Sequence, residues 1–386
     1  MKPRLLSAMS GPPVYQQGRA LLIGWRIERM GASVELKSET APVRAGEELD
    51  RQALAAYLRS QFGGASEIAV EQFPYGHSNL VYLVRFGGRE YVLRRPPLGP
   101  VAPKAHDMAR EFRVLRAIAP YFPEAPRVVL LCEEPAVIGC TFFLMERRRG
   151  LIIRDAMPPQ LAAIPDHARR VSETFVDCLA RLRSIDVSAS GLEALGKVEG
   201  FVERQVRGWT ERWQRAQTEE LPEMNTVIRW LAERLPRTQG ASLVHNDYKL
   251  DNVMLSADGG RVEAVLDWEM ATVGEPLADL GLTLCYWTWA PEAIQNDSYA
   301  SSALHRPRSG WFSRDEFLER YAARSGGDVS GIGYYEVLGV FKLAVILQQI
   351  YFRFHCGQTR DERFRNFNGQ VRALARTAVR LAEINR

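Results

Sequence analysis

The sequence predicts an α+β protein with two lobes, a small N-terminal lobe of an antiparallel sheet plus a helix and a larger, mostly helical C-terminal lobe. The first observation is length, because 386 residues are long for one compact domain. The second is that β-rich runs separated by turn residues fill residues 67–94. The third is that after Gly150 the apolar residues recur mainly at the spacing of amphipathic helices.

Composition and charge narrow the class of protein. Apolar residues make up 46% and charged residues 25%, as in soluble globular proteins. The net charge of +4 is too small to cover a nucleic acid backbone, so we expect no nucleic-acid partner. The five cysteines are widely spaced without a C-x-x-C pair, which argues against a disulfide framework or zinc site and fits a reducing cytoplasm. The apolar segment 334–354 contains Glu336, Lys342 and Arg353 and is predicted to be a buried helix, with no membrane association.

The N-terminal lobe is predicted to span residues 47–146. Residues 1–46 carry scattered Pro and Gly without periodicity and are interpreted as a poorly ordered arm. The predicted elements of the lobe are a helix at 50–62, strands at 67–73, 80–86 and 90–94, a helix at 105–119, and strands at 127–132 and 139–145. Turn residues separate the first three strands, which therefore form an antiparallel meander.

The C-terminal lobe, residues 147–386, is predicted to be helical apart from one strand-forming region at 243–267. Its predicted helices are 168–185, 199–217, 223–235, 313–323, 334–354 and 367–384. Ser313 and Glu316 form the S-x-x-E pattern of a capping box, which marks the start of one of these helices.

The strand-forming region holds the residues best suited to chemistry. His245, Asp247 and Asn252 have the spacing H-x-D-x-x-x-x-N, which is typical of phosphoryl-transfer catalytic loops. The motif alone also fits an ordinary loop, because Asn and Asp are loop formers. His245 lies next to an apolar strand and is interpreted as a structural histidine.

The residues after this motif are predicted to form a hairpin that turns at residues 258–260. If Gly259 and Gly260 make the turn, Asn252 faces Asp267, and the two side chains can share one Mg²⁺. If the turn lies one residue earlier, Asn252 faces Val265 and the two ligands are separated. The sequence leaves both registers open.

A buried acid is predicted in the N-terminal lobe. Glu111 falls within the apolar stripe of the helix at 105–119, and a buried carboxylate needs a cationic partner. Arg94 shares a strand face with Val92, in the place where kinases have their phosphate-binding lysine. The pair of Arg94 and Glu111 is the predicted phosphate anchor. Arg95 points to the opposite face and is the weaker candidate, and an ordinary surface arginine is the alternative.

Other residues are assigned to the nucleotide. Gly76, Ser78 and Asn79 belong to the first strand connection, which either covers the phosphates or is only a hairpin loop. Met145 precedes the presumed hinge between the lobes and is also assigned to the nucleotide site. Lys249 is predicted to project near the γ-phosphate, with a solvated lysine as the alternative.

Four further features have predicted roles. Glu269 is expected either to contact a second metal or to cap the next segment, and Asp279 to brace the catalytic loop by hydrogen bonds. The aromatic run 286–289 is assigned to the core, with the wall of a substrate cleft as the alternative. The run 147–149, three arginines, is interpreted as a solvated face, with attraction of an anionic substrate as the alternative.

Together these motifs resemble the aminoglycoside phosphotransferase and choline kinase superfamily, whose members have a bilobal protein-kinase-like fold. The resemblance spans roughly residues 65–355 and is nearest to the branch fused to acyl-CoA dehydrogenases in some organisms. The segments that carry it are 92–97, 110–115, 245–248 and 266–269. Members often have Gly where Asn246 stands, which leaves the role of Asn246 open.

The resemblance implies ATP and Mg²⁺ as cofactors and assigns roles by position. It makes Asp247 the catalytic aspartate, Asn252 and Asp267 the magnesium ligands, and Arg94 the substitute for the usual lysine, with Glu111 as its partner. The implied activity is transfer of the γ-phosphate to a hydroxyl of a small molecule. The rival interpretation is a catalytically silent nucleotide-binding or scaffold protein.

The acceptor is narrowed by spacing and charge. Only 11 residues separate Asp267 from Asp279, too few for the long loop on which protein kinases dock peptides. Residues 313–386 contain 12 Lys or Arg and 8 Asp or Glu, a poor lining for a polycationic aminoglycoside. By family likeness a hydroxyacyl-CoA ranks first, ahead of sugar alcohols, amino alcohols and aminoglycosides.

Overall fold

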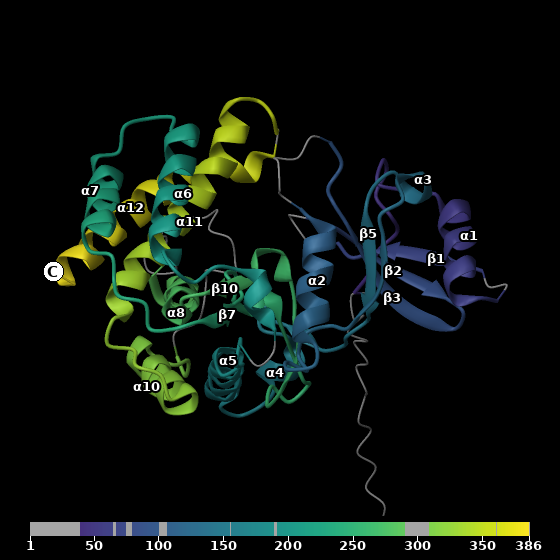
Figure 1. Ribbon diagram of the computed structural model, residues 1–386, viewed down its shortest axis with the longest axis horizontal. Helices are drawn as coiled ribbons and strands as arrows, with labels where there is room; N and C mark the ends of the chain where they lie inside the picture. The colour runs from purple at the N-terminus through teal and green to yellow at the C-terminus, as the bar shows by residue number, and fades with distance from the viewer. Residues whose placement is uncertain are drawn as a thin grey trace, which may run out of the picture. The chain divides into compact units, whose positions relative to one another are not determined.

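The computed structural model describes residues 39–64, 67–74, 79–99, 106–154, 156–188, 191–289, 309–359 and 361–385. Residues Glu39–Arg386 form one compact unit. Within it, a sheet with helices is followed by a mostly helical half, as predicted (Figure 1). The short helix at Pro135–Ile138 was not predicted.

The N-terminal lobe is a five-stranded antiparallel sheet in the order β1-β2-β3-β5-β4. Its strands are β1 (Ala69–Gln72), β2 (Leu80–Phe86), β3 (Arg89–Arg95), β4 (Val128–Cys132) and β5 (Phe142–Glu146). The predicted meander and the two later strands are therefore confirmed. The alternation of buried side chains serves two hydrophobic clusters, one on each face of the sheet.

Helices cover both faces of this sheet. Helices α1 (Arg51–Phe62) and α3 (Pro135–Ile138) pack on one face, and α2 (Met108–Ile118) packs on the other (Figure 1). Asp50 and Asp107 cap α1 and α2 by accepting backbone hydrogen bonds from Ala53 and Arg110. Helix α2 therefore lies between the sheet and the C-terminal lobe.

Part of the predicted arm belongs to this lobe. Ala41 pairs with Gln72 at the sheet edge through two backbone hydrogen bonds. The amide of Arg44 donates to Gln72 Oε1 at 2.9 Å, and the Tyr82 hydroxyl donates to the carbonyl of Glu47. The boundary predicted at residue 46 thus lies inside a segment that is already attached to the sheet.

The C-terminal lobe contains the six predicted helices with ends shifted by at most two residues. Its helices in the described residues are α4 (Pro159–Ala162), α5 (His167–Arg183), α6 (Phe201–Ala216), α7 (Pro222–Glu233), α8 (Pro276–Leu284), α10 (Arg314–Ser325), α11 (Ile332–His355) and α12 (Phe367–Ile384). The capping box of Ser313 and Glu316 is present, with both reciprocal hydrogen bonds. Helix α8 was not predicted, because all nine of its residues are buried and leave no amphipathic period.

Short strands hold the strand-forming region together. Strands β6 (Leu151–Ile152), β8 (Val253–Leu255) and β9 (Val262–Val265) form a small sheet, and β7 (Ser242–Val244) pairs with β10 (Thr272–Gly274). Strands β6 and β10 have two and three residues, too few to show a period in the sequence.

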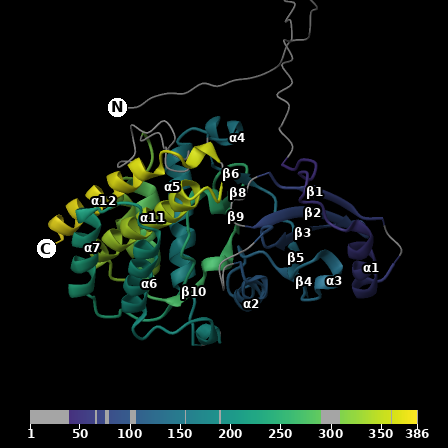
Figure 2. The same cartoon turned by 90° about the horizontal axis from the view of Figure 1, so that it is seen from above.

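Helix α11 lies in the core of the C-terminal lobe. By length and composition it could cross a membrane, since an 18-residue window has a mean hydropathy of 1.4. However, 61% of that window is buried, and α11 packs against α12, α8 and α6 (Figure 2). Its predicted character as a buried helix is confirmed.

Helices α8 and α11 approach most closely at Gly281, and this contact yields a stability prediction. A Cβ added to Gly281 would lie 2.4 Å from the carbonyl carbon and oxygen of Tyr335. These are backbone atoms, which cannot relieve the clash by a change of rotamer. Gly281→Ala should therefore lower the free energy of unfolding by about 3 kcal/mol in urea denaturation. The control Gly369→Ala, where no atom lies within 4 Å of the added Cβ, should lose no stability. Equal stability of the two variants would contradict this packing.

Candidate active site

The loop with the predicted catalytic motif runs from His245 to Asn252, after β7, and is braced by Asp279 of α8. Asp279 accepts the backbone amides of His245 at 2.7 Å and Asn246 at 2.8 Å. Burial raises the pKa of the Asp279 carboxyl, and these bonds and the nearby His245 oppose that effect. The bracing role predicted for Asp279 is thus present in the hydrogen bonds.

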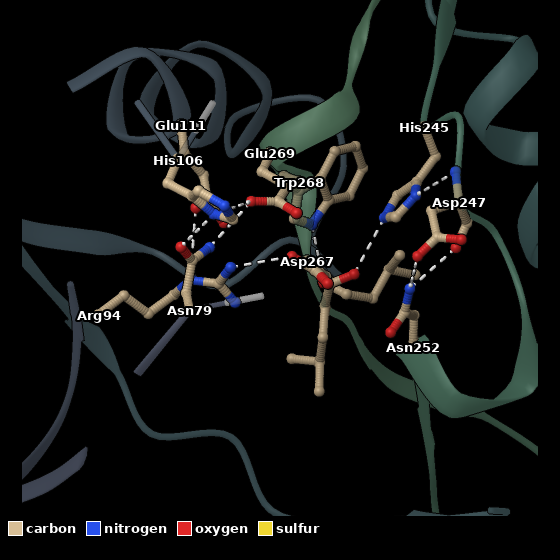
Figure 3. A network of polar contacts seen from close by, with 12 residues as sticks. Asn79, Arg94, His106, Glu111, His245, Asp247, Asn252, Asp267, Trp268 and Glu269 are labelled. Carbon is tan, nitrogen blue, oxygen red and sulfur yellow. Dashed lines mark hydrogen bonds and ion pairs between the residues drawn. The ribbon is translucent and has the colours of Figure 1, made fainter. Parts of the chain in front are cut away.

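His245 joins this loop to the end of β9. Its Nδ1 accepts from the backbone amide of Asp247 at 3.3 Å, which leaves Nε2–H to donate to the carbonyl of Leu266 at 3.0 Å. The ring is fully buried beside Trp268 (Figure 3). His245 is therefore a structural histidine in its contacts, as predicted.

Asp247 is surrounded by hydrogen-bond donors. Its Oδ1 accepts from Lys249 Nζ at 3.0 Å and from the Tyr286 hydroxyl at 2.9 Å. Its Oδ2 accepts from Asn252 Nδ2 at 2.8 Å, and Lys249 Nζ lies 2.9 Å from the same oxygen. Lys249 is therefore paired with Asp247 in this structure and is not simply solvated.

Asn252 ends a 3₁₀ turn, η2 (Leu250–Asn252), and directs its amide nitrogen to Asp247. Both of these hydrogen bonds use Nδ2, so Oδ1 is the atom available to a metal ion. The carbonyl of Asn252 accepts the backbone amide of Leu266 at 2.8 Å.

The hairpin register differs from both predicted alternatives. Val253 pairs with Val265, so Asn252 faces Leu266 and neither Asp267 nor Val265. Next to the turn, Leu255 pairs with Val262, which is the register of the second alternative. A register shift between Met254 and Leu255 then moves the pairing at Asn252 by one residue, because it leaves an unpaired residue in one strand.

Asp267 lies directly after β9 and is bound by Arg94. Its φ of 68° is in the left-handed region, before the 3₁₀ turn η3 (Trp268–Met270). Arg94 Nη2 donates to Asp267 Oδ1 at 2.9 Å (Figure 3). Burial alone would raise the pKa of Asp267, but Arg94 and then Lys249 hold it below its usual range. Asp267 is therefore an ionised carboxylate.

The predicted pair of Arg94 and Glu111 is present. Arg94 Nε lies 3.3 Å from Glu111 Oε2, and the Glu111 side chain is 1% exposed. Burial, opposed by Arg94, raises the pKa of Glu111 to about 7. Arg94 thus bridges Glu111 on α2 and Asp267 in the C-terminal lobe, and this second contact was not predicted.

A second set of contacts joins η3 to α2 and to the residues next to it. Asn79 donates to Glu269 Oε2 at 2.9 Å and accepts from His106 Nδ1 at 2.9 Å (Figure 3). The carboxylate of Glu269 is therefore hydrogen-bonded to a side chain of the N-terminal lobe. Arg110 donates to the carbonyls of Glu269 at 2.8 Å and Ala271 at 2.5 Å. Beyond the other end of the helix, the carbonyl of Glu124 accepts the Val265 amide at 2.8 Å.

Several assigned residues lie elsewhere or outside the described residues. Gly76 and Ser78 are outside them. Met145 is 7% exposed on β5, paired with Val92 and Val128, and its role in nucleotide binding stays a prediction. Arg95 is also buried and donates to the carbonyl of Ile138.

The arginine run 147–149 differs from its prediction. Arg147 is 9% exposed and bonds to Glu39 and Glu90, Arg149 bonds to Glu90, and Arg148 bonds to Glu146. The run therefore forms ion pairs with the sheet, and among its three side chains Arg149, which is 65% exposed, is the one that lies largely in solvent as predicted.

Asn246 and Lys342 form a buried contact next to Asp247. Asn246 has a φ of 64°; its Nδ2 donates to the carbonyl of Met270, and its Oδ1 accepts from Lys342 Nζ at 3.3 Å. The ammonium of Lys342 also lies 5.5 Å from the centre of the Trp209 ring. Asn246, whose role the sequence left open, thus connects the loop to Met270 and to Lys342. Lys342 lies beside the site, although no pattern in the sequence indicated this.

Lys342 leads to a prediction about pH. Burial lowers its pKa from 10.5 to about 8, although Asp279 and Asp247 raise it, while Arg212 lowers it further. Between about pH 8 and 10.5, Lys342 binds a proton more tightly in the unfolded chain than in the folded protein. Its contribution to the free energy of unfolding therefore increases as the pH rises from about 8 to 10.5. From pH 7 to 9.5 the wild type should gain about 2 kcal/mol of unfolding free energy relative to Lys342→Met, measured by urea denaturation. A constant difference across this range would contradict the shift.

The oxygen atoms available here suit a nucleotide-bound Mg²⁺. No group of three or more His, Cys, Asp or Glu in the described residues could hold a metal ion by itself. Asp267 supplies a carboxylate and Asn252 an amide oxygen, both hard ligands, and Mg²⁺ commonly takes its other ligands from waters and phosphates. The donor set therefore fits Mg²⁺ that arrives with a nucleotide.

Comparison with known proteins identifies related sequences. A family model described as "Phosphotransferase enzyme family" matches residues 69–324. Acyl-CoA dehydrogenase family member 10 of Mus musculus is 34% identical over 323 residues, covering 83% of this chain and 30% of the relative. Acyl-CoA dehydrogenase family member 11 of Homo sapiens is 32% identical over 357 residues, covering 90% of this chain and 45% of the relative. The chain thus spans less than half the length of these relatives.

Solved structures with the same fold are also available. A "putative aminoglycoside phosphotransferase" from Ralstonia eutropha superposes with a TM-score of 0.72 at 28% identity, covering 87% of this chain and 99% of the other. The aminoglycoside phosphotransferase APH(4)-Ia, in a complex with AMP-PNP and hygromycin B, gives a TM-score of 0.54 at 17% identity over 84% of this chain and 98% of the other. This second likeness shows a shared fold.

Proposed function

Since the chain belongs to the phosphotransferase enzyme family, we propose that it transfers the γ-phosphate of ATP, with Mg²⁺, to a hydroxyl group of a small molecule. One observation carries the proposal. Asp247 is hydrogen-bonded to Asn252, and Arg94 pairs with Asp267 and Glu111 from the other lobe. His245 connects the two sets, because it accepts from the Asp247 amide and donates to the carbonyl of Leu266, next to Asp267 (Figure 3).

Each residue has a role in this reaction. Asp247 orients the acceptor hydroxyl and accepts its proton, while Lys249 and Arg94 neutralise phosphate charge. Asn252 and Asp267 would hold the Mg²⁺, which supplies charge neutralisation on the phosphates. Glu111 keeps the Arg94 guanidinium in place from its buried side. Positioning and charge neutralisation supply most of the rate in such transfers.

For the acceptor, the proposal names a hydroxyacyl-CoA first. The longer relatives carry acyl-CoA dehydrogenase names, and an anionic acceptor suits the excess of Lys and Arg in residues 313–386. Aminoglycosides come second, because the solved neighbours carry that name.

The alternative is a silent nucleotide-binding protein, and ADP release separates the two. The protein should release ADP from Mg-ATP when one class of a panel of hydroxyacyl-CoAs, sugar alcohols, amino alcohols and aminoglycosides is added. Thermal stabilisation by Mg-ATP without ADP release from any acceptor would favour the silent protein. Turnover with aminoglycosides alone would reverse the ranking of acceptors.

A further inference from the structure

The carboxylate of Asp247 is crowded by hydrogen-bond donors. A carboxylate offers about four lone-pair sites, two on each oxygen. Asp247 accepts three hydrogen bonds, from Lys249 and Tyr286 on Oδ1 and from Asn252 on Oδ2, and the Lys249 ammonium also lies 2.9 Å from Oδ2. Oδ1 therefore holds two donors, and an acceptor hydroxyl that binds this oxygen has to displace one of them.

Tyr286 is the one of these three donors that does not belong to the loop 245–252. Asn252 and Lys249 belong to the catalytic loop and serve the metal and the phosphates, whereas Tyr286 belongs to a π-helix, η4 (Cys285–Trp289), that continues α8. Such π-helical turns are frequent at functional sites. The Tyr286 ring is 7% exposed, and Lys249 Nζ lies 5.2 Å from its centre.

The phenol of Tyr286 resembles the group that Asp247 has to bind. It is a hydroxyl whose oxygen lies 2.9 Å from Asp247 Oδ1, within the distance of a proton-transferring hydrogen bond. Burial, followed by the charge of Asp247, raises its pKa well above 10, so the phenol stays a donor at neutral pH.

We propose that the Tyr286 hydroxyl holds the acceptor's place on Asp247 Oδ1 and keeps water from this oxygen, so that only an alcohol able to displace the phenol is phosphorylated. This inference rests on the proposed function. In the productive step the acceptor O–H gives its proton to Asp247, its oxygen bonds to the γ-phosphorus, and the bond to the bridging oxygen breaks to release ADP. With water in place of the alcohol, the same step yields ADP and inorganic phosphate.

Removing the phenolic oxygen tests the proposal without a known acceptor. Tyr286→Phe should raise ADP release from Mg-ATP in buffer without acceptor by about tenfold, the effect of one hydrogen bond to a charged group. Adding Asp247→Asn should abolish the increase. Tyr286→Leu also lacks the oxygen and should show the same increase. It replaces the phenylalanine variant in the test if that variant folds poorly.

The matched control is Tyr334→Phe. This change removes another buried hydroxyl, which donates to the carbonyl of Leu231 on α7 at 2.9 Å, and ADP release should stay at the wild-type level.

Three results would overturn the inference. Unchanged or lower ADP release in folded Tyr286 variants would mean that Tyr286 only orients Asp247. Phosphate on Tyr286 after incubation with Mg-ATP, detected by mass spectrometry, would make it an acceptor and not a shield. Absence of Mg-ATP binding and of ADP release with every acceptor in the wild type would overturn the proposed function as well, which distinguishes that failure from the first two.

Discussion

Asp267→Asn should lower the rate of ADP formation by about 10³-fold and weaken Mg-ATP binding. The substitution keeps the shape of the side chain but removes the only carboxylate of the two predicted metal ligands. It also removes the negative charge that Arg94 contacts at 2.9 Å. Of the two acidic partners of Arg94, Glu111 then remains. Both the metal and the phosphate anchor are therefore affected by one change.

Calorimetry of Mg-ATP binding is the measurement for this variant, because it does not require the acceptor. Asp258→Asn is the control, since Asp258 lies in the turn of the same hairpin and is exposed, with bonds to Ser256 and Gly260. The control should bind Mg-ATP as the wild type does. Unchanged binding by Asp267→Asn would remove the basis of the metal assignment.

Asp247→Asn should lower phosphate transfer by about 10³-fold while Mg-ATP binding is retained. The amide can still accept hydrogen bonds from Lys249 and Tyr286 through its oxygen, but it cannot take the proton of the acceptor. The two variants thus separate two roles, since Asp267 acts on nucleotide binding and Asp247 on the transfer itself.

The measurement is the transfer rate at saturating Mg-ATP with whichever acceptor is turned over, together with the dissociation constant of the nucleotide. Asp258→Asn again serves as the control and should keep wild-type transfer. If Asp247→Asn retained a tenth of the wild-type rate or more, a general-base role for Asp247 would be wrong.

The sequence was sufficient wherever local patterns decide the structure. The capping box of Ser313 and Glu316 is readable within four residues, and both bonds form. Glu111 was identified because a charged residue interrupts an apolar helical stripe, and its partner Arg94 followed from the strand period. Each of these features can be predicted from the residues of a single helix or strand.

Features that depend on the whole fold were not readable. The register at Asn252 was one residue off, because a strand irregularity has no signature in a single sequence. Tyr286 was assigned to the core, with the wall of a substrate cleft as the alternative, but no local pattern predicts the π-helix or the hydrogen bond from its hydroxyl to Asp247. Lys342 reaches Asn246 from a helix nearly a hundred residues later in the chain.

The contacts on either side of Glu111 limit how α2 can move. Arg110, in the first turn of α2, donates to the carbonyls of Glu269 and Ala271, and Glu124, in the loop after the helix, accepts from the Val265 amide of β9. An outward tilt of the helix that carries Glu111 would therefore break hydrogen bonds to the C-terminal lobe at two separate places.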